Sequence, residues 1–159
     1  MPTTKSLPIQ NERNLQRAIK LILNPEKTMG QTLTSGYKIN YVNNADFEMK
    51  LTRKMARLAL GQSNKKSDQE VVARHIIQSF DPNDNLTPEE IHEIGRQTVL
   101  ELTGGNHEFV IATHVDQDHY HNHIIFNATS SVDLKKFRWQ KGTTNLLRNI
   151  SDKIADYHW

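Results

Sequence analysis

The chain has 159 residues, enough for one domain with a sizeable core, and its 20 lysines and arginines nearly balance its 18 aspartates and glutamates. This near-neutral balance excludes a general polyanion binder, although clustered cations can still form a local binding surface. The absence of cysteine excludes disulfides and thiolate metal ligands and fits a cytoplasmic protein, and no apolar run predicts membrane insertion or a secretion signal.

The first segments predict an extended N-terminus, with an edge strand at residues 6–9, followed by a helix from about residue 11. The helix ends at Asn24-Pro25, because the residue before proline avoids helical geometry. Its apolar stripe consists of Leu15, Ala18, Ile19, Ile22 and Leu23. Leu21 lies off this stripe, on the polar side of the helix.

Residues 25–44 predict a loop with a short strand, and a second helix is expected from about residue 44 to Gly61. Its predicted buried side consists of Phe47, Leu51, Met55 and Leu58. The other faces carry Lys50, Arg53, Lys54 and Arg57, and a polar loop with Lys65 and Lys66 follows. This cationic face is either a solvated helix surface or a surface that contacts phosphates.

Residues 71–80 predict a strand, closed by Pro82, that carries His75 and Ser79 on one face. The next helix has a strong start at Thr87-Pro88-Glu89-Glu90, with a threonine cap and a glutamate that completes a capping box. Its buried side consists of Ile91, Ile94, Val99 and Leu102, and it ends at Gly104-Gly105.

The central feature is a histidine-rich hairpin made of strands at residues 107–114 and 121–127. Strand periodicity places His121 and His123 on one face, and a turn through residues 115–120 brings His114 opposite them. Histidine-rich stretches can also be solvated loops, but two on one face with a third at hairpin distance favour a metal site with open positions. His119, in the turn, is expected to face solvent.

The C-terminal part interleaves aromatic and basic residues and then predicts a helix. This pattern suits the binding of single-stranded nucleic acid, because bases stack on aromatic rings and phosphates pair with cations. The candidate DNA-contacting residues are Lys135, Lys136, Arg138, Trp139 and Lys141. A basic edge strand would look similar. The last helix has the predicted inward residues Leu146, Ile150, Ile154 and Tyr157. The order of elements predicts an α+β fold with a central, mainly antiparallel sheet flanked by helices.

On three motifs, the sequence resembles the relaxases, or mobilisation nucleases, of conjugative and mobilisable plasmids and integrative elements, MOB-P-like members of the HUH endonuclease superfamily. The main motif is H-x-D-x-x-x-x-H-x-H-x-x-x-N, carried by His114, Asp116, His121, His123 and Asn127. The other two are the stretches AIKLILNPEKT and RHIIQSF. The resemblance covers nearly the whole chain and implies one relaxase domain over residues 1–159, the N-terminal part of a longer protein.

The resemblance also implies a reaction and its partners. The three histidines would bind Mg²⁺ or Mn²⁺ rather than Zn²⁺, with Asp116 orienting a ligand histidine, Asn127 in support and Ser79 holding DNA beside the nick. A tyrosine would attack the scissile phosphate at a transfer origin, leaving a free 3′ hydroxyl and a protein joined to the 5′ phosphate. Implied partners are origin DNA as a single strand, an accessory DNA-binding protein and a type IV coupling protein.

The sequence departs from the family at the nucleophile, because Leu21 occupies the position where the tyrosine is expected. Leucine has no nucleophilic atom. Tyr37 and Tyr41 are candidate substitutes, since they are the tyrosines nearest in sequence. Two alternatives to a nicking enzyme therefore stay open: a module that binds the origin without nicking it, and a three-histidine metallohydrolase that uses zinc-activated water.

Overall fold

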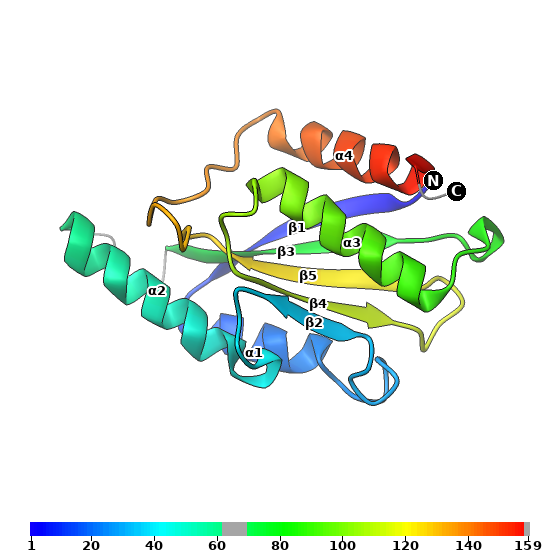
Figure 1. The fold of residues 1–159 in the computed structure, drawn as a ribbon, viewed down its shortest axis with the longest axis horizontal. Coiled ribbons are helices and arrows are strands. Elements are labelled where there is room, and N and C mark those ends of the chain that lie inside the picture. Colours follow the sequence, from blue (N-terminus) through cyan, green and yellow to red (C-terminus); the bar gives the residue numbers. More distant parts are fainter. Residues whose placement is uncertain (62–69, 158–159) are drawn as a thin grey trace.

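The computed structural model describes residues 1–61 and 70–157, so Lys65 and Lys66 lie outside the described residues. Its five strands form one sheet in the order β1-β3-β5-β4-β2, in which every neighbouring pair is antiparallel. The strands are β1 Thr3–Gln10, β2 Thr34–Tyr37, β3 Val71–Ser79, β4 Phe109–His114 and β5 His121–Asn127. The predicted α+β class with an antiparallel sheet is confirmed (Figure 1).

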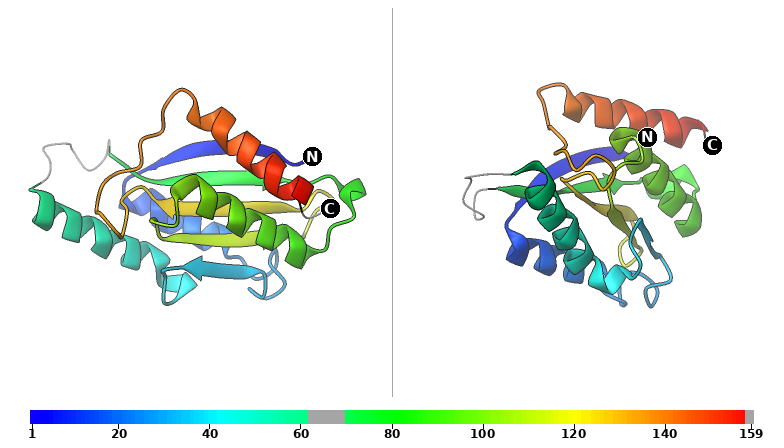
Figure 2. Two further views of the ribbon diagram at one scale, coloured as in Figure 1. Left: turned by 45° about the horizontal axis from the view of Figure 1, so that its top comes forward. Right: turned by 60° about the vertical axis from the view of Figure 1, so that its left-hand side comes forward.

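In the described part of the chain, four helices cover the two faces of the sheet. They are α1 Glu12–Ile22, α2 Ala45–Leu60, α3 Pro88–Thr103 and α4 Thr143–Tyr157, with short 3-10 turns η1 Val42–Asn44 and η2 Pro82–Asp84. Residues of α3 and α4 share one buried cluster with Ile76, Ile111 and Ile124 of the sheet. Residues of α1 and α2 share another with Ala112 and Ile125, so the helices lie in pairs on opposite faces (Figures 1 and 2).

Two helices follow the sequence pattern closely. The predicted stripe of α1 is buried at Leu15, Ile19 and Ile22, and the Asn11 side chain caps the helix by accepting a hydrogen bond from the backbone N–H of Asn14. Helix α3 begins with the predicted capping box at Thr87 and ends at Gly104, which has a φ of 67°. This way of ending a helix needs a residue in the left-handed backbone conformation, which glycine adopts without a steric penalty.

The buried side of helix α2 differs from the predicted one. Phe47, Leu51, Met55 and Leu58 are exposed, and the helix instead packs through Ala45, Met49, Thr52, Arg53 and Ala56. Both sets have helical spacing, and hydrophobicity alone favours the wrong one. The inward set is selected by small side chains and by a buried polar contact, because the Arg53 guanidinium pairs with Glu12 of α1.

Helix α4 also differs from its predicted phase. Leu147, Ile150 and Ile154 are buried, whereas Leu146 and Tyr157 are exposed. The inward face includes Ser151, whose hydroxyl accepts a hydrogen bond from Gln78 of β3 at 2.8 Å. The prediction is thus confirmed for Ile150 and Ile154, and the inward face also carries a polar contact that apolar periodicity does not reveal.

Among the described residues, no helix combines the length and the apolar character that crossing a membrane requires.

Candidate metal centre and active site

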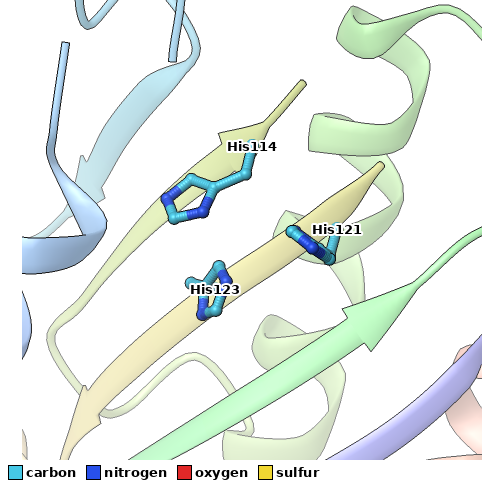
Figure 3. Close-up of side chains that lie close together, drawn as sticks. All are labelled: His114, His121 and His123. Carbon is cyan, nitrogen blue, oxygen red and sulfur yellow. The ribbon is translucent and has the colours of Figure 1, made fainter. Parts of the chain in front are cut away.

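The predicted hairpin forms, and it brings the three histidines together on the sheet face that α1 covers. His114 lies directly opposite His121 across the β4–β5 pair, and Ala112 lies opposite His123. Each histidine offers a ring nitrogen, and these three atoms all lie within 4.8 Å of one another. Figure 3 shows the rings gathered over the ends of the two strands. His119 is exposed in the turn, as predicted.

A buried hydrogen-bond network on the opposite face aligns the strands that carry these histidines. Thr113 of β4 donates to the Oδ1 of Asn122 at 2.6 Å, and the Nδ2 of Asn122 donates to the Oε1 of Gln78 on β3 at 2.9 Å. Asn122 lies between His121 and His123 in sequence. Because a slip by one residue would reverse the face of every side chain, these fully satisfied amides help to fix the histidines' positions.

The nitrogen atoms present fit a bound divalent ion. Three ligands at about 2 Å from one ion lie about 3 Å apart in a facial arrangement, so side-chain rotations that close the group by up to about 2 Å suffice. The Nε2 of His114 donates to the Ile22 carbonyl at 2.8 Å, which leaves its Nδ1 lone pair for an ion. The Nδ1 of His121 is buried without a hydrogen-bond partner among the described residues, as expected of a group that lacks its ligand.

Leu21 lies at the same pocket as the histidines. A cavity of about 390 Å³ is lined by Leu21, Lys27 and His75 as well as by His114, His121 and His123. The side chain of Leu21 is 72% exposed, in agreement with its place off the apolar stripe. The end of α1 is held there by the His114 bond to Ile22, and the turn after it is held by the Val115 backbone N–H, which donates to the Lys27 carbonyl at 2.9 Å.

Burial keeps several of these imidazoles neutral. Loss of hydration, reinforced by the neighbouring His114, lowers the pKa of His75 to about 4. Burial also lowers the pKa of His123 to about 2, with further contributions from His114 and His75, and lowers the pKa of His114. Neutral imidazole is the form that binds a metal, so the site needs no deprotonation near neutral pH.

The lowered histidine pKa values predict a stability that falls with acidification in metal-free protein. Between the folded pKa of about 4 and the unfolded value of 6.5, His75 binds its proton only after unfolding, and His123 behaves likewise from 6.5 down to about 2. Each such group contributes a loss of up to about 1.4 kcal/mol per pH unit below its unfolded pKa. Urea unfolding of chelator-treated protein at several pH values would measure this slope.

Matched variants identify the source of that slope. His119→Ala should leave the slope unchanged, because this ring is exposed in the hairpin turn. A double variant with His75→Leu and His123→Leu should make the slope shallower. Part of it should remain, because the pKa values of His92, His107 and His114 are also lowered. A urea midpoint that stays constant from about pH 7 to about pH 5 would contradict the expectation.

His75 is the pocket residue that sequence reasoning left without a role. Its Nε2 lies 2.9 Å from the Nδ1 of His123, and the two ring centroids are 5.1 Å apart. In the sequence, the available indication of a role for His75 was its place on the same strand face as Ser79. The pairing of β3 with β5 is what brings that face beside the hairpin. Ser79 itself lies opposite His121 in this pair, at the edge of the histidine group.

Asp116 and Asn127 were expected to support the metal ligands, and the structure places both in other surroundings. Asp116 is exposed at the rim of the pocket, and its charge favours the protonated form of His114. Asn127 is fully buried beneath α2, where its Oδ1 accepts from Arg53 at 2.9 Å and its Nδ2 donates to Glu108 at 2.8 Å. Asn127 therefore stabilises the packing of α2 on the sheet, at a distance from the pocket lining.

The cationic candidates divide into buried and exposed groups. Arg53 is 2% exposed and tied to Glu12 and Asn127, so its predicted role in contacting DNA is wrong. Exposed cations are Lys50, Lys54, Arg57, Lys135, Lys136, Arg138 and Lys141. Arg57, Lys135, Lys136 and Arg138 border a second cavity of about 520 Å³ between α2 and the segment after β5. Glu70 pairs with Arg57 and Lys136 there.

Trp139 lies in an irregular segment rather than in a basic edge strand. An isolated bridge joins Thr129 to Lys136, and the chain from residue 137 to 140 has no regular structure. The Trp139 ring is partly buried against the core and stacks under Arg74, whose guanidinium carbon lies 4.4 Å from the ring centroid. This contact occupies one face of the ring.

The structure does not bring the substitute tyrosines to the histidines. Tyr37 stacks on Phe109, on the α3 side of the sheet, and its hydroxyl donates to the Gly105 carbonyl at 2.9 Å. Tyr41 is 74% exposed before η1, where its backbone N–H donates to Glu48. Neither lines the histidine pocket, and Leu21 does.

Comparisons with known proteins agree with this geometry. The family model for relaxases described as MobA/VirD2-like, nuclease domain, matches residues 21–158. The chain is 44% identical to the group II intron-interrupted relaxase LtrB of Lactococcus lactis subsp. cremoris, over 91% of this chain and 31% of that protein. It is 35% identical to the protein rlx of Staphylococcus aureus, over 55% of this chain and 27% of that one. The chain thus spans under a third of these relatives.

A solved structure shows the same fold at low sequence identity. It is the MobM relaxase domain bound to pMV158 oriT DNA in a Mn-bound crystal structure, with a TM-score of 0.69 and 12% identity, covering 99% of this chain and 86% of that one. The family match extends over most of the chain and includes Leu21 and the histidine hairpin. The chain therefore belongs to the MobA/VirD2-like relaxases and represents their nuclease domain.

Proposed function

We propose that this domain binds single-stranded DNA at the transfer origin of a plasmid or integrative element and holds one phosphate for strand transfer. The observation that carries the proposal is the shared pocket of Leu21 and the three histidines. The family's nucleophile position and a set of candidate metal ligands thus border the same space, as an attack on a metal-bound phosphate requires. The MobM relaxase, of the same fold, binds oriT DNA and Mn.

His114, His121 and His123 would hold a divalent ion, Mn²⁺ or Mg²⁺, which when bound neutralises the charge that grows on the phosphate. An imidazole that binds a metal is an uncharged ligand, so three such ligands would leave the ion its full positive charge. Lys27, also in the pocket lining, adds a cation beside the phosphate. Ser79, opposite His121, would contact the DNA next to it.

The complete reaction would be a transesterification in which a hydroxyl attacks the phosphate, a covalent 5′-phosphate adduct forms and a 3′ hydroxyl leaves. One observation favours binding without nicking as the second candidate: among the described residues, no tyrosine lines the pocket. In that case the Leu21 chain retains metal and DNA binding but cannot form the adduct. A zinc-dependent hydrolase would instead release cleaved DNA with no protein attached.

DNA outside the pocket would follow the exposed cations. The cavity between α2 and residues 134–138 lies on the molecular surface, and Arg57, Lys135, Lys136 and Arg138 surround it. Phosphate contacts of this kind give affinity without sequence information. In the cell, we expect the domain to meet plasmid DNA in the cytoplasm, together with an accessory DNA-binding protein and a type IV coupling protein.

Metal and DNA binding test the proposal directly. Calorimetric titration should show one Mn²⁺ per chain, and His123→Ala should weaken that binding by about a hundredfold or more, because one of three ligands is lost. His119→Ala is the matched control, since it removes an exposed histidine of the same hairpin. Equal Mn²⁺ affinity in both variants would exclude this metal site.

The DNA experiment distinguishes the three candidate functions. A labelled single-stranded pool with a randomised core is incubated with protein and Mn²⁺, then divided between a native and a denaturing gel. A shift that survives denaturation indicates transesterification, and a shift seen only on the native gel indicates binding without nicking. Shortened DNA without attached protein indicates hydrolysis, and no shift on either gel rejects the proposed function.

A further inference from the structure

His75 contacts the histidine group from a neighbouring strand without belonging to it. The β3–β5 pair places His75 opposite Ile125, diagonally across from His123. The His75 Nε2 lies 2.9 Å from the His123 Nδ1, whereas the three candidate ligands are His114, His121 and His123. His75 therefore lies one hydrogen bond away from a candidate metal ligand.

Coordination chemistry fixes the direction of this hydrogen bond. An imidazole that binds a metal does so through the lone pair of one nitrogen, and its other nitrogen then carries the proton and donates it. The contact with His75 occupies the Nδ1 of His123, so Nε2 is the atom left to face an ion. His123 must then donate from Nδ1, and His75 must accept at Nε2 and carry its own proton on Nδ1.

A similar arrangement exists at His114. There the Nε2 donates to the Ile22 carbonyl, an acceptor that carries no proton of its own, so that Nδ1 is the free nitrogen. The same hydrogen bond holds the ring in one orientation. At His123 the acceptor is a side chain, which makes its role accessible to mutation.

We propose that His75 is the positioning residue that holds His123 in its Nδ1–H tautomer and thereby presents the Nε2 of His123 to the divalent ion. This inference rests on the proposed metal-dependent function. The sequence motif suggests Asp116 for such a role, but Asp116 is exposed at the pocket rim. A neutral acceptor orients the ligand without adding negative charge, so more of the ion's charge acts on the phosphate.

Two variants of His75 test the proposal through Mn²⁺ affinity. His75→Leu removes the acceptor but keeps an apolar side chain of comparable size, and we expect it to weaken Mn²⁺ binding about ten- to a hundredfold. His75→Gln should restore affinity close to that of the unchanged chain, because the glutamine amide oxygen reaches about as far as the imidazole Nε2. Titration with Mn²⁺ alone measures both, so DNA cleavage is not needed.

The tautomer of His123 gives a second readout, which the unchanged chain already provides and which does not depend on metal affinity. Long-range ¹H–¹⁵N NMR spectra of the metal-free chain should show the proton of His123 on Nδ1, and His75→Leu should move it partly or wholly to Nε2. A purely structural role of His75 would change stability without changing this tautomer. An Nε2–H tautomer in the unchanged chain would overturn the proposal.

The outcomes separate this inference from the proposed function. If the unchanged chain binds no Mn²⁺, or binds it equally well after His123→Ala, the metal-dependent function itself fails. If the unchanged chain binds Mn²⁺ and His75→Leu binds it with the same affinity, the positioning role of His75 fails while the metal site stands. Should His75→Leu not fold, the comparison of His75→Gln with the unchanged chain and the NMR spectrum still decide the question.

Discussion

Replacing Leu21 with tyrosine is expected to give a chain that captures single-stranded DNA covalently in the presence of Mn²⁺. Leu21 lines the pocket of the three histidines and is 72% exposed, so a larger ring can be placed there without disturbing the core. The phenol hydroxyl supplies the nucleophilic atom that leucine lacks. Adduct formation on a denaturing gel should rise from background by about a hundredfold or more.

Leu21→Phe is the matched control for that result. It adds the same ring without the hydroxyl, so it should bind DNA and Mn²⁺ as the tyrosine variant does but form no adduct. A combined Leu21→Tyr and His123→Ala variant should also lose the adduct, because the phosphate is then no longer held by the ion. If Leu21→Tyr binds DNA and Mn²⁺ yet forms no adduct, position 21 is not the nucleophile position in this chain.

Gly95→Ala is expected to destabilise the protein, although alanine is the better helix former. A Cβ at Gly95 would lie 2.4 Å from the Nδ2 of Asn122 and 2.7 Å from the Cδ1 of Ile111. Asn122 cannot move away easily, because it is fully buried and bonded to Gln78, Thr113 and the Ile91 carbonyl. Overpacking of this kind costs about 1–3 kcal/mol, and disturbing the network adds to it, against about 1 kcal/mol gained in helix propensity.

We therefore expect the free energy of unfolding to fall by about 2 kcal/mol, measured by urea denaturation. Gly142→Ala provides the control, because among the described residues beyond its chain neighbours no atom lies within 4 Å of the added Cβ, and its effect should stay within about 0.5 kcal/mol. Mn²⁺ affinity should weaken in Gly95→Ala as well, since Asn122 lies between two candidate ligands. A Gly95→Ala chain as stable as the unchanged protein would show that α3 does not approach the sheet this closely.

The histidine hairpin is the part of the site that sequence predicts best. Alternation along a strand depends only on local backbone geometry, so the shared face of His121 and His123 follows from their spacing. The short turn then fixes His114 opposite His121, as the structure confirms. The capping box at Thr87 is equally local, because its hydrogen bonds join residues within one turn of the helix.

Contacts between distant segments explain what sequence periodicity misses. In α2 two faces have helical spacing, and the inward one is decided by Arg53, which pairs with Glu12 and bonds to Asn127. The same contact buries Arg53, which the sequence predicts to contact DNA. A cationic helix residue reads as exposed in a sequence, since charged groups are rarely buried unless a partner from elsewhere in the fold is present.

By itself, the sequence determined the shared face of the histidines and the helix signals, since each depends on residues close together in the chain. The order of elements determined the fold class, and the resemblance to relaxases marked the leucine at position 21 as unusual. Only the tertiary structure decided that Leu21 borders the histidine pocket and that His75 contacts His123. Both facts depend on how α1 and β3 pack against the hairpin. No local pattern encodes these placements, because they arise from pairing and burial across segments far apart in the chain.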